Sequence, residues 1–302
     1  MTENVLFAMD ARRASAALEP TIGLDLVYLD PPYGLGVEMN ARSAKGEARG
    51  RRQTRSGPAA YADALPVPDL VAMLGEVAQG VVRRMNPGAL FCLHMDHRAV
   101  HEAKIAMDDV FGRGAFAGEI IWAPGNGARG SGFSFTHQTI LLYARTPAER
   151  RDVRWRTDHP ALREPYAKTS TEMHFRHEDE QGRRYRERTV GGKTYRYYAD
   201  VGRRLGSVWS DIPAMVANTP LMKEGTGYPT QKPERLLERI VLAGSDEGGT
   251  VADLMCGSGT TLVVAARLGR RFVGADASPL AISVTEARLR RAGVAFCYPD
   301  TT

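Results

Sequence analysis

The chain has 302 residues, 43% of them hydrophobic, and a formal net charge of +5. This length and apolar content allow one large α/β domain with a smaller insertion. The three cysteines are an odd number without the spacing of metal ligands, so we expect no disulfide framework, no zinc site and a reducing, cytoplasmic location. No segment has the pattern of a signal peptide, and no apolar run is long enough to span a membrane.

The first predicted elements lead to a proline-containing turn. Residues 4–18 predict a helix, and the apolar run Leu24–Leu29 predicts a buried strand. The tetrapeptide Asp30-Pro31-Pro32-Tyr33 follows at the carboxyl end of that strand, where open α/β sheets place their ligands. The prolines lack N–H groups, so a backbone carbonyl stays available beside the Asp30 carboxylate. Two acceptors beside an aromatic ring suit a planar group with an exocyclic NH2, although a plain strand-ending turn is the alternative.

Residues 34–60 show no periodicity and form a basic connection. Six lysines and arginines, Arg51 and Arg52 among them, stand against two glutamates. A connection of this length without structure of its own predicts a functional loop, with arginines placed to contact phosphates. A solvated loop without contacts is the alternative.

Helices and strands then alternate as far as residue 143. Helical spacing of apolar residues predicts helices over residues 69–85 and 97–111. Apolar runs predict strands over residues 89–93, 119–122 and 139–143.

Histidines and aromatic residues lie near the ends of these strands. We expect His94 and His97 to be structural hydrogen-bonding groups rather than catalytic ones. Trp122, Phe133 and Phe135 lie around the glycine-rich segment 125–132, where each either packs in the core or covers a planar ligand.

Residues 146–227 interrupt the alternation and predict an insertion that is dense in arginine and lysine. Within it, two strands flank the dipeptide Gly191-Gly192 and predict a hairpin. Strand alternation predicts that its arginines share one face and form a basic stripe that could follow phosphates. These arginines are Arg184, Arg186, Arg188 and Arg196. A solvated face balanced by nearby carboxylates is the alternative.

The C-terminal part of the chain predicts a βαβ unit. After a helix that starts at Pro233, residues 251–254 predict a buried strand that leads into the glycine turn Met255-Cys256-Gly257-Ser258-Gly259-Thr260-Thr261 and a second helix. Asp276 follows the next predicted strand. Its separation from Asp253 along the sequence is that of the ribose-binding acid in such units. A helix capped by Ser278 and a strand over residues 294–298 complete the chain. An ordinary αβ repeat with a tight turn is the alternative to a cofactor site.

Three motifs resemble those of the S-adenosylmethionine-dependent DNA amino-methyltransferases, which act on adenine N6 or cytosine N4. Along this chain the catalytic motif comes first and the cofactor motif comes last. Asp30 to Tyr33 matches their catalytic motif, and Asp253 to Thr261 matches their cofactor motif, commonly Asp-Pro-Phe-x-Gly-Ser-Gly-Thr-Thr. Residues 228–237 look like the segment just before the cofactor motif in the β class, which has this motif order. Leu254 and Met255 replace the usual Pro and Phe. Since Met can pack against an adenine as Phe does, we expect an altered cofactor affinity rather than its loss.

The resemblance implies a Rossmann-like α/β methyltransferase sheet with helices on both faces and an inserted target-recognition region. It implies a catalytic half over residues 1–145, with the mobile basic loop 34–60. Target recognition would lie in residues 146–227 and the cofactor-binding half in residues 228–302.

The resemblance also implies the site. Asp30, Pro31, Pro32 and Tyr33 would be catalytic: two acceptors would hold the amino group of the target base while Tyr33 stacks on it. S-adenosylmethionine would be the cofactor, and no metal is expected. The residues expected to bind this cofactor are Thr230, Lys232, Asp253, Met255, Gly257, Ser258, Gly259, Thr260 and Asp276.

Double-stranded DNA is the expected partner, through Arg51, Arg52 and the hairpin arginines; a homodimer and a cognate restriction endonuclease stay open. Adenine N6 is favoured over cytosine N4 because the family's cytosine enzymes usually have Ser in place of Asp30. A methyltransferase acting on RNA or on a protein amide is a further alternative. So is a DNA-binding protein that holds the cofactor without turning it over.

Overall fold

A computed structural model describes residues 3–34, 37–41, 57–125, 132–215 and 224–299. The chain forms two compact units. Residues 1–154 and 207–302 make the first, and residues 155–206 make the second. The second unit is shorter than the predicted insertion at residues 146–227.

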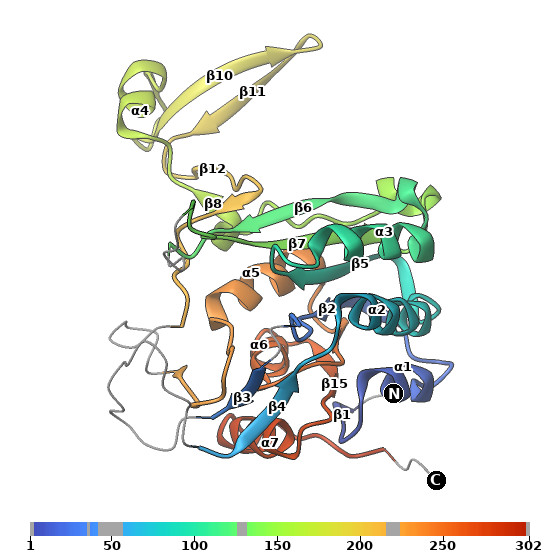
Figure 1. Ribbon diagram of the computed structural model, residues 1–302. Coiled ribbons are helices and arrows are strands. Elements are labelled where there is room, and N and C mark those ends of the chain that lie inside the picture. Colours follow the sequence, from blue (N-terminus) through green and yellow to red (C-terminus); the bar gives the residue numbers. More distant parts are fainter. Residues whose placement is uncertain (1–2, 35–36, 42–56, 126–131, 216–223, 300–302) are drawn as a thin grey trace. The chain divides into compact units, whose positions relative to one another are not determined.

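The first unit is built on a mixed sheet that has eight strands among the described residues (Figure 1). Their order is β1 (Val5–Phe7), β15 (Arg271–Ala275), β14 (Thr250–Asp253), β2 (Leu24–Leu29), β5 (Met85–Met95), β7 (Gln138–Ala144), β6 (Phe116–Trp122) and β13 (Val208–Trp209). The first five are mutually parallel, β7 is antiparallel to both of its neighbours, and β13 is parallel to β6. The central strands are apolar throughout because helices cover both of their faces.

Strand alternation divides the core into two layers. In β2, Val27 and Leu29 pack on one face of the sheet, with α1 (Ala11–Ala17), α2 (Val67–Val82) and α3 (Val100–Phe111). Leu26 and Tyr28 pack on the other. That second face is covered by α5 (Glu234–Gly244), α6 (Thr260–Arg267) and α7 (Pro279–Arg291). The predicted Rossmann-like sheet with helices on both faces is confirmed.

Two terminal predictions were wrong. Residues 4–18 were predicted to be one helix, but residues 5–7 form β1 beside β15, and the helix begins only after Asp10, whose carboxylate caps the N–H groups of Arg12 and Arg13. Pairing with a distant strand overrides the local helical pattern. Residues 294–298 were predicted to be a strand, and within the described residues only an isolated bridge joins Cys297 to Val5.

The connection at residues 34–60 has structure at both ends, against the expectation of none. Its described ends form β3 (Val37–Asn40) and β4 (Ala59–Asp63), an antiparallel pair. Arg51 and Arg52, predicted to contact DNA, lie outside the described residues.

The second unit contains the predicted hairpin. Strands β10 (Arg184–Val190) and β11 (Lys193–Tyr198) pair across a turn in which Gly191 and Gly192 both have positive φ, and β9 (His177–Glu178) joins them. The unit also has α4 (Lys168–His174) and the pair β8 (Arg163–Glu164) with β12 (Arg203–Arg204). The prediction that all four hairpin arginines share one face was wrong. Arg196 is opposite Glu187 in the register, and so lies on the face away from Arg186 and Arg188.

Candidate active site

Two neighbouring strands bring the predicted catalytic and cofactor motifs together. β2 ends at Leu29 before Asp30, and β14 ends at Asp253, and these strands are paired in parallel. After β14 the chain continues to β15 on one side of this pair, and after β2 it continues to β5 on the other side. The strand order therefore reverses between β14 and β2, and open α/β sheets bind ligands at such a switch point. A cavity of about 450 Å³ opens here. Its lining includes all the predicted catalytic and cofactor-binding residues except Gly259.

The carboxylate of Asp30 has two partners within the site. The Tyr33 hydroxyl donates to Asp30 Oδ1 at 2.5 Å, and the Lys232 ammonium donates to Asp30 Oδ2. Lys232 Nζ also donates to the Tyr33 hydroxyl at 3.1 Å. Burial and the charge of Asp30 raise the pKa of Tyr33 well above its ordinary value, so this hydroxyl keeps its proton and remains a donor. The three side chains therefore form one closed hydrogen-bonded group.

The backbone after the catalytic turn is held by a residue that the sequence did not identify. The Gly34 N–H donates to Asp63 Oδ1 at 2.6 Å, and Asp63 is buried at the end of β4. Gly34 has φ +70°, and a Cβ on it would lie 2.9 Å from the carbonyl oxygen of Leu65. The β3–β4 pair thus positions the end of the turn that begins at Asp30. No sequence signal near Asp63 points to this role, because it depends on the pairing of β3 with β4.

The glycine turn after β14 is built around buried polar groups. The Asp253 carboxylate accepts from the Met255 N–H at 3.1 Å, and burial raises the pKa of Asp253 to about 7. Gly259 has φ +72° and begins α6, packed so closely against Thr285 that a Cβ would lie 2.6 Å from its hydroxyl. Gly259 therefore shapes the turn instead of lining the cavity.

Asp276 ties the glycine turn to the end of β15. Its Oδ2 accepts from the Gly257 N–H and its Oδ1 from the Ser278 N–H, both at 2.8 Å. Burial raises the pKa of Asp276. Each carboxylate oxygen still has a lone pair for a ligand at the cavity wall.

The segment at residues 228–232 forms another part of the wall of the first cavity. The rings of Tyr228 and Tyr61 stack with centroids 6.4 Å apart, and the Tyr61 hydroxyl lies 3.2 Å from Thr230 Oγ1. Thr230 has φ +58°, a conformation that non-glycine residues rarely adopt outside constrained sites. Lys232 was predicted to bind the cofactor, and in the structure its ammonium contacts Asp30 and Tyr33.

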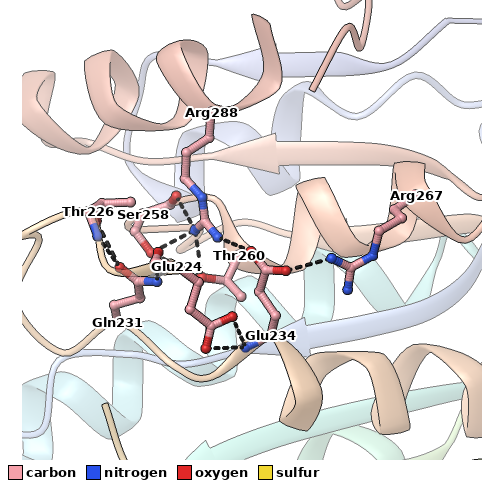
Figure 2. Close-up of polar contacts among 8 residues, drawn as sticks. All are labelled: Glu224, Thr226, Gln231, Glu234, Ser258, Thr260, Arg267 and Arg288. Carbon is pink, nitrogen blue, oxygen red and sulfur yellow. Dashed lines mark hydrogen bonds and ion pairs between the residues drawn. The ribbon is translucent and has the colours of Figure 1, made fainter. Parts of the chain in front are cut away.

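A partly buried ion pair between Arg288 and Glu234 contacts the glycine turn (Figure 2). Arg288 donates to Glu234 at 2.7 Å, to the Ser258 carbonyl at 2.9 Å and to Thr260 Oγ1 at 2.8 Å. Glu234 also accepts from Arg267 at 2.5 Å. These contacts connect α5, α6 and α7 to the glycine turn after β14. Neither Arg288 nor Glu234 has a sequence signal for this contact, because a charged residue on a helix ordinarily faces solvent.

The same network reaches residues just before the Tyr228 segment. The backbone N–H of Glu234 donates to the Glu224 carboxylate, and Gln231 donates to the Glu224 carbonyl at 2.9 Å (Figure 2). Gln231 accepts from the N–H and hydroxyl of Thr226 at 2.9 and 2.8 Å. The chain on both sides of Thr230 is therefore anchored.

A second cavity, of about 520 Å³, adjoins the first. Tyr33, Thr230, Gln231 and Lys232 line both. Trp122 and Phe135 line the second, where Phe135 is 59% exposed and its ring stacks on His97 at a centroid distance of 3.6 Å. Exposed aromatic surface beside the catalytic turn provides a place for a planar group.

His94 lies behind this region and is fully buried. Its Nδ1 lies 2.7 Å from the Tyr28 hydroxyl, and burial, with the positive charge of Lys232, lowers the pKa of His94 to about 3. His94 is therefore neutral at physiological pH. The predicted structural role agrees with this burial.

The hairpin arginines of the second unit differ in their surroundings. Arg184 donates to the Phe175 carbonyl at 3.1 Å, Arg186 lies over the rings of Phe175, Tyr166 and Tyr197, and Arg196 donates to Glu187 at 3.0 Å. Arg188 is exposed and has no polar partner among the described residues. Three of the four thus stabilise their own unit.

The described residues include no group of three or more His, Cys, Asp or Glu side chains placed to hold a metal ion. None of their helices is both long and apolar enough to cross a membrane.

A family model matches most of the chain, and two curated relatives each match about a third of it. A family model described as DNA methylase, of the N6 and N4 type, matches residues 24–286. The chain is 45% identical over 89 residues to the type II methyltransferase M2.DpnII of Streptococcus pneumoniae, which is 29% of this chain and 31% of that protein. It is 44% identical over 93 residues to the DNA adenine methyltransferase YhdJ of Escherichia coli K12, 31% of this chain and 29% of that protein. These matches thus span about a third of either relative.

The fold is also found among solved structures. The structure of TTHA0409 from Thermus thermophilus, a DNA modification methylase by its description, was solved with S-adenosyl-L-methionine. It superposes with a TM-score of 0.54 at 19% identity, over 99% of both chains. The match of the family model over most of the sequence shows that this chain belongs to the N6/N4 DNA methylase family.

Proposed function

We propose that this protein transfers a methyl group from S-adenosylmethionine to the exocyclic N6 of an adenine in double-stranded DNA, with the adenine turned out of the duplex. The observation that carries the proposal is the position of Asp30. Its carboxylate faces the same 450 Å³ cavity as the Gly257 turn and Asp276, which have the features of a nucleoside site.

The cofactor of this family is S-adenosylmethionine, whose sulfonium supplies the methyl group. The residues present fit it. The cavity has the volume of a small-molecule site, and the backbone at Gly257 lies so close to Tyr228 that a Cβ would come within 3.2 Å of its ring. Asp276, Met255 and Thr230 line this cavity. In the proposal Asp276 accepts from ribose hydroxyls, Met255 packs against the cofactor's adenine, and Thr230 contacts the methionine end.

The chemistry at the target amine requires two acceptors. The lone pair of an adenine amino group is shared with the ring, and positive charge develops on the nitrogen as it is alkylated. Asp30 and the Pro31 carbonyl each accept one N6 hydrogen, which directs the lone pair toward the methyl group and stabilises the developing charge. Tyr33 and Lys232 occupy only two of about four acceptor positions on the Asp30 carboxylate, so positions remain for the amine.

The second cavity is the place proposed for the turned-out base. Tyr33 lines both cavities, and its ring covers one face of the base. Trp122 and Phe135 are the candidates for the other face, and Phe135 is the more accessible. A base held here would lie beside the cofactor cavity, because four residues line both cavities.

DNA recognition is assigned to residues 146–227, as the family's organisation implies. Within the hairpin, Arg188 is the arginine proposed to contact phosphates, because the other three have partners in their own unit. The similarity to a type II methyltransferase supports a role in restriction and modification, with a cognate endonuclease as partner, in the cytoplasm at the nucleoid.

Cytosine N4 is the second candidate for the target. It has the same amine chemistry, and the family includes both kinds of enzyme. Asp30, where cytosine enzymes usually have Ser, and the similarity to a DNA adenine methyltransferase favour adenine.

The test is to incubate the purified protein with methyl-labelled S-adenosylmethionine and mixed-sequence duplex DNA, and to identify labelled nucleosides by mass spectrometry. Labelled N6-methyladenosine is expected. Labelled N4-methylcytosine would overturn the base assignment and keep the mechanism. Cofactor binding without label in DNA would overturn the proposed reaction.

A further inference from the structure

The ammonium of Lys232 and the carboxylate of Asp30 place a donor and an acceptor side by side at the wall shared by the two cavities. We propose that Lys232 donates a hydrogen bond to the ring nitrogen beside the reacting amine, and so selects the base. The inference rests on the proposed function, because it assigns a role at the same site.

The donor count of Lys232 supports this role. An ammonium has three N–H donors, and within the described residues two of them are used, on Asp30 Oδ2 and on the Tyr33 hydroxyl. Lys232 is only 8% exposed and lines both cavities, so a ligand in either cavity can approach its third donor. A buried charged donor without a partner is unfavourable, and a ligand acceptor would satisfy it.

The chemistry of the bases determines what fits. Adenine has the acceptor N1 beside its N6 amine, and cytosine has the acceptor N3 beside its N4 amine. Guanine and thymine show the reverse pattern on that edge, a carbonyl oxygen beside a ring N–H. In their case Asp30 would face a carbonyl oxygen and Lys232 would face a donor, and both contacts are repulsive. The pair therefore accepts the two amine-bearing bases and rejects the other two.

The surroundings hold this pair in one arrangement. Tyr33 keeps its proton and bridges the two charged groups, and neutral His94 adds no competing positive charge nearby. The anchored backbone on both sides of Thr230 limits the movement of Lys232. Lys232 is thus a specificity residue that touches the substrate ring, while Asp30 acts on the amine.

The test compares two target nucleotides in the full-length protein. After the methylated site has been mapped, kcat/KM is measured on duplexes with adenine or 1-deazaadenine at the target, the latter having C–H in place of N1. The wild-type protein is expected to lose about 10- to 100-fold on 1-deazaadenine, the effect of a hydrogen bond to a charged donor. Lys232→Met is expected to have a lower kcat/KM on both duplexes. Its ratio of kcat/KM on adenine to kcat/KM on 1-deazaadenine is expected to be near 1. An equal ratio in the two proteins would overturn the inference.

Controls separate this role from a structural one. A duplex with 7-deazaadenine, altered on the opposite edge, is expected to give the same ratio in both proteins. Lys232→Gln, which keeps a neutral donor, is expected to retain part of the discrimination. If Lys232→Met has no measurable turnover, the affinities for the adenine and 1-deazaadenine duplexes give the same comparison by fluorescence anisotropy. A wild-type protein that leaves the adenine duplex unmethylated would refute the proposed function itself.

Discussion

The guanidinium of Arg288 lies 2.7 Å from the carboxylate of Glu234, although the two residues are 54 positions apart. Arg288 is 4% exposed, and burial lowers its pKa, an effect that the charge of Glu234 opposes. Arg288 also donates to the Ser258 carbonyl and to Thr260. One buried cation thus connects the last helix to the turn proposed to bind the cofactor.

Arg288→Met is expected to lower the free energy of unfolding by about 1–3 kcal/mol, because the Ser258 carbonyl and the Thr260 hydroxyl lose a buried charged donor while Glu234 keeps its ion pair with Arg267. It should also weaken cofactor binding, because the Ser258 turn loses two contacts. Urea denaturation and calorimetric titration with S-adenosylmethionine measure the two effects. The matched control is Arg267→Met, which removes the half-exposed partner of the same Glu234 and is expected to lower stability by less than about 1 kcal/mol. Equal losses in both variants would contradict the assigned role.

Asp30→Ala is expected to abolish detectable methyl transfer while the affinity for S-adenosylmethionine is retained, because Asp30 acts on the target amine and Asp276 acts on the cofactor. Turnover is measured by the labelled-nucleoside assay and cofactor affinity by titration. An active Asp30→Ala enzyme would refute the catalytic assignment. Loss of cofactor affinity instead would mean that Asp30 mainly shapes the cavity.

Asp276→Ala is expected to show the opposite pattern. The substitution removes the acceptor proposed for the ribose and the ties to the Gly257 and Ser278 N–H groups. We expect the dissociation constant for S-adenosylmethionine to rise by about 10- to 100-fold. At saturating cofactor, kcat should change much less than KM, and steady-state kinetics at several cofactor concentrations distinguish the two. A large fall in kcat with unchanged KM would argue for a role in the chemical step.

The titration of Asp253 is expected to make the stability of the protein depend on pH. Burial raises its folded-state pKa to about 7, from an ordinary value of 3.8. Between these values the folded chain binds more protons than the unfolded chain, so this group's contribution to the free energy of unfolding falls as pH rises from about 4 to 7. The fall is about 4 kcal/mol at most.

The measurement for Asp253 is the difference in unfolding free energy between the wild-type protein and Asp253→Asn, which removes this titration. The unfolding free energy of the wild type minus that of Asp253→Asn should be larger at pH 5 than at pH 8. A difference that does not change with pH would contradict the prediction.

Arg188→Ala is expected to weaken DNA binding without changing stability. Losing one phosphate contact should reduce the slope of log affinity against log salt by about 1. Arg186→Ala is the comparison, because Arg186 packs on three aromatic rings and its loss should destabilise the second unit. DNA binding measured at several salt concentrations, with thermal unfolding of both variants, separates the two roles. An unchanged salt slope for Arg188→Ala would argue for a solvated hairpin face.

Much of the architecture follows from local sequence patterns. The apolar run Leu24–Leu29 has the composition of a strand buried on both faces, and the glycine turn after Asp253 leads directly into a helical pattern. For that reason the motifs could be assigned to the carboxyl ends of strands. The carboxyl ends of neighbouring parallel strands lie at the same edge of the sheet, so the motifs could be expected to lie close together. Val5–Phe7 was assigned to a helix instead, because its strand conformation depends on β15, at the other end of the chain.

The pairing of the side chains could not be read from such patterns. Lys232 has the same sequence context whether it contacts a cofactor or Asp30, and Asp63 and Arg288 have no local signal of their contacts with Gly34 and Ser258. Hydrogen bonds and buried ion pairs depend on distances of about 3 Å between residues far apart in the chain, whereas periodicity reports only which face of an element is apolar. The sheet, its motifs and their order were therefore predictable from the amino-acid sequence, and the charged groups that meet at Asp30 became known only from the packing of the folded chain.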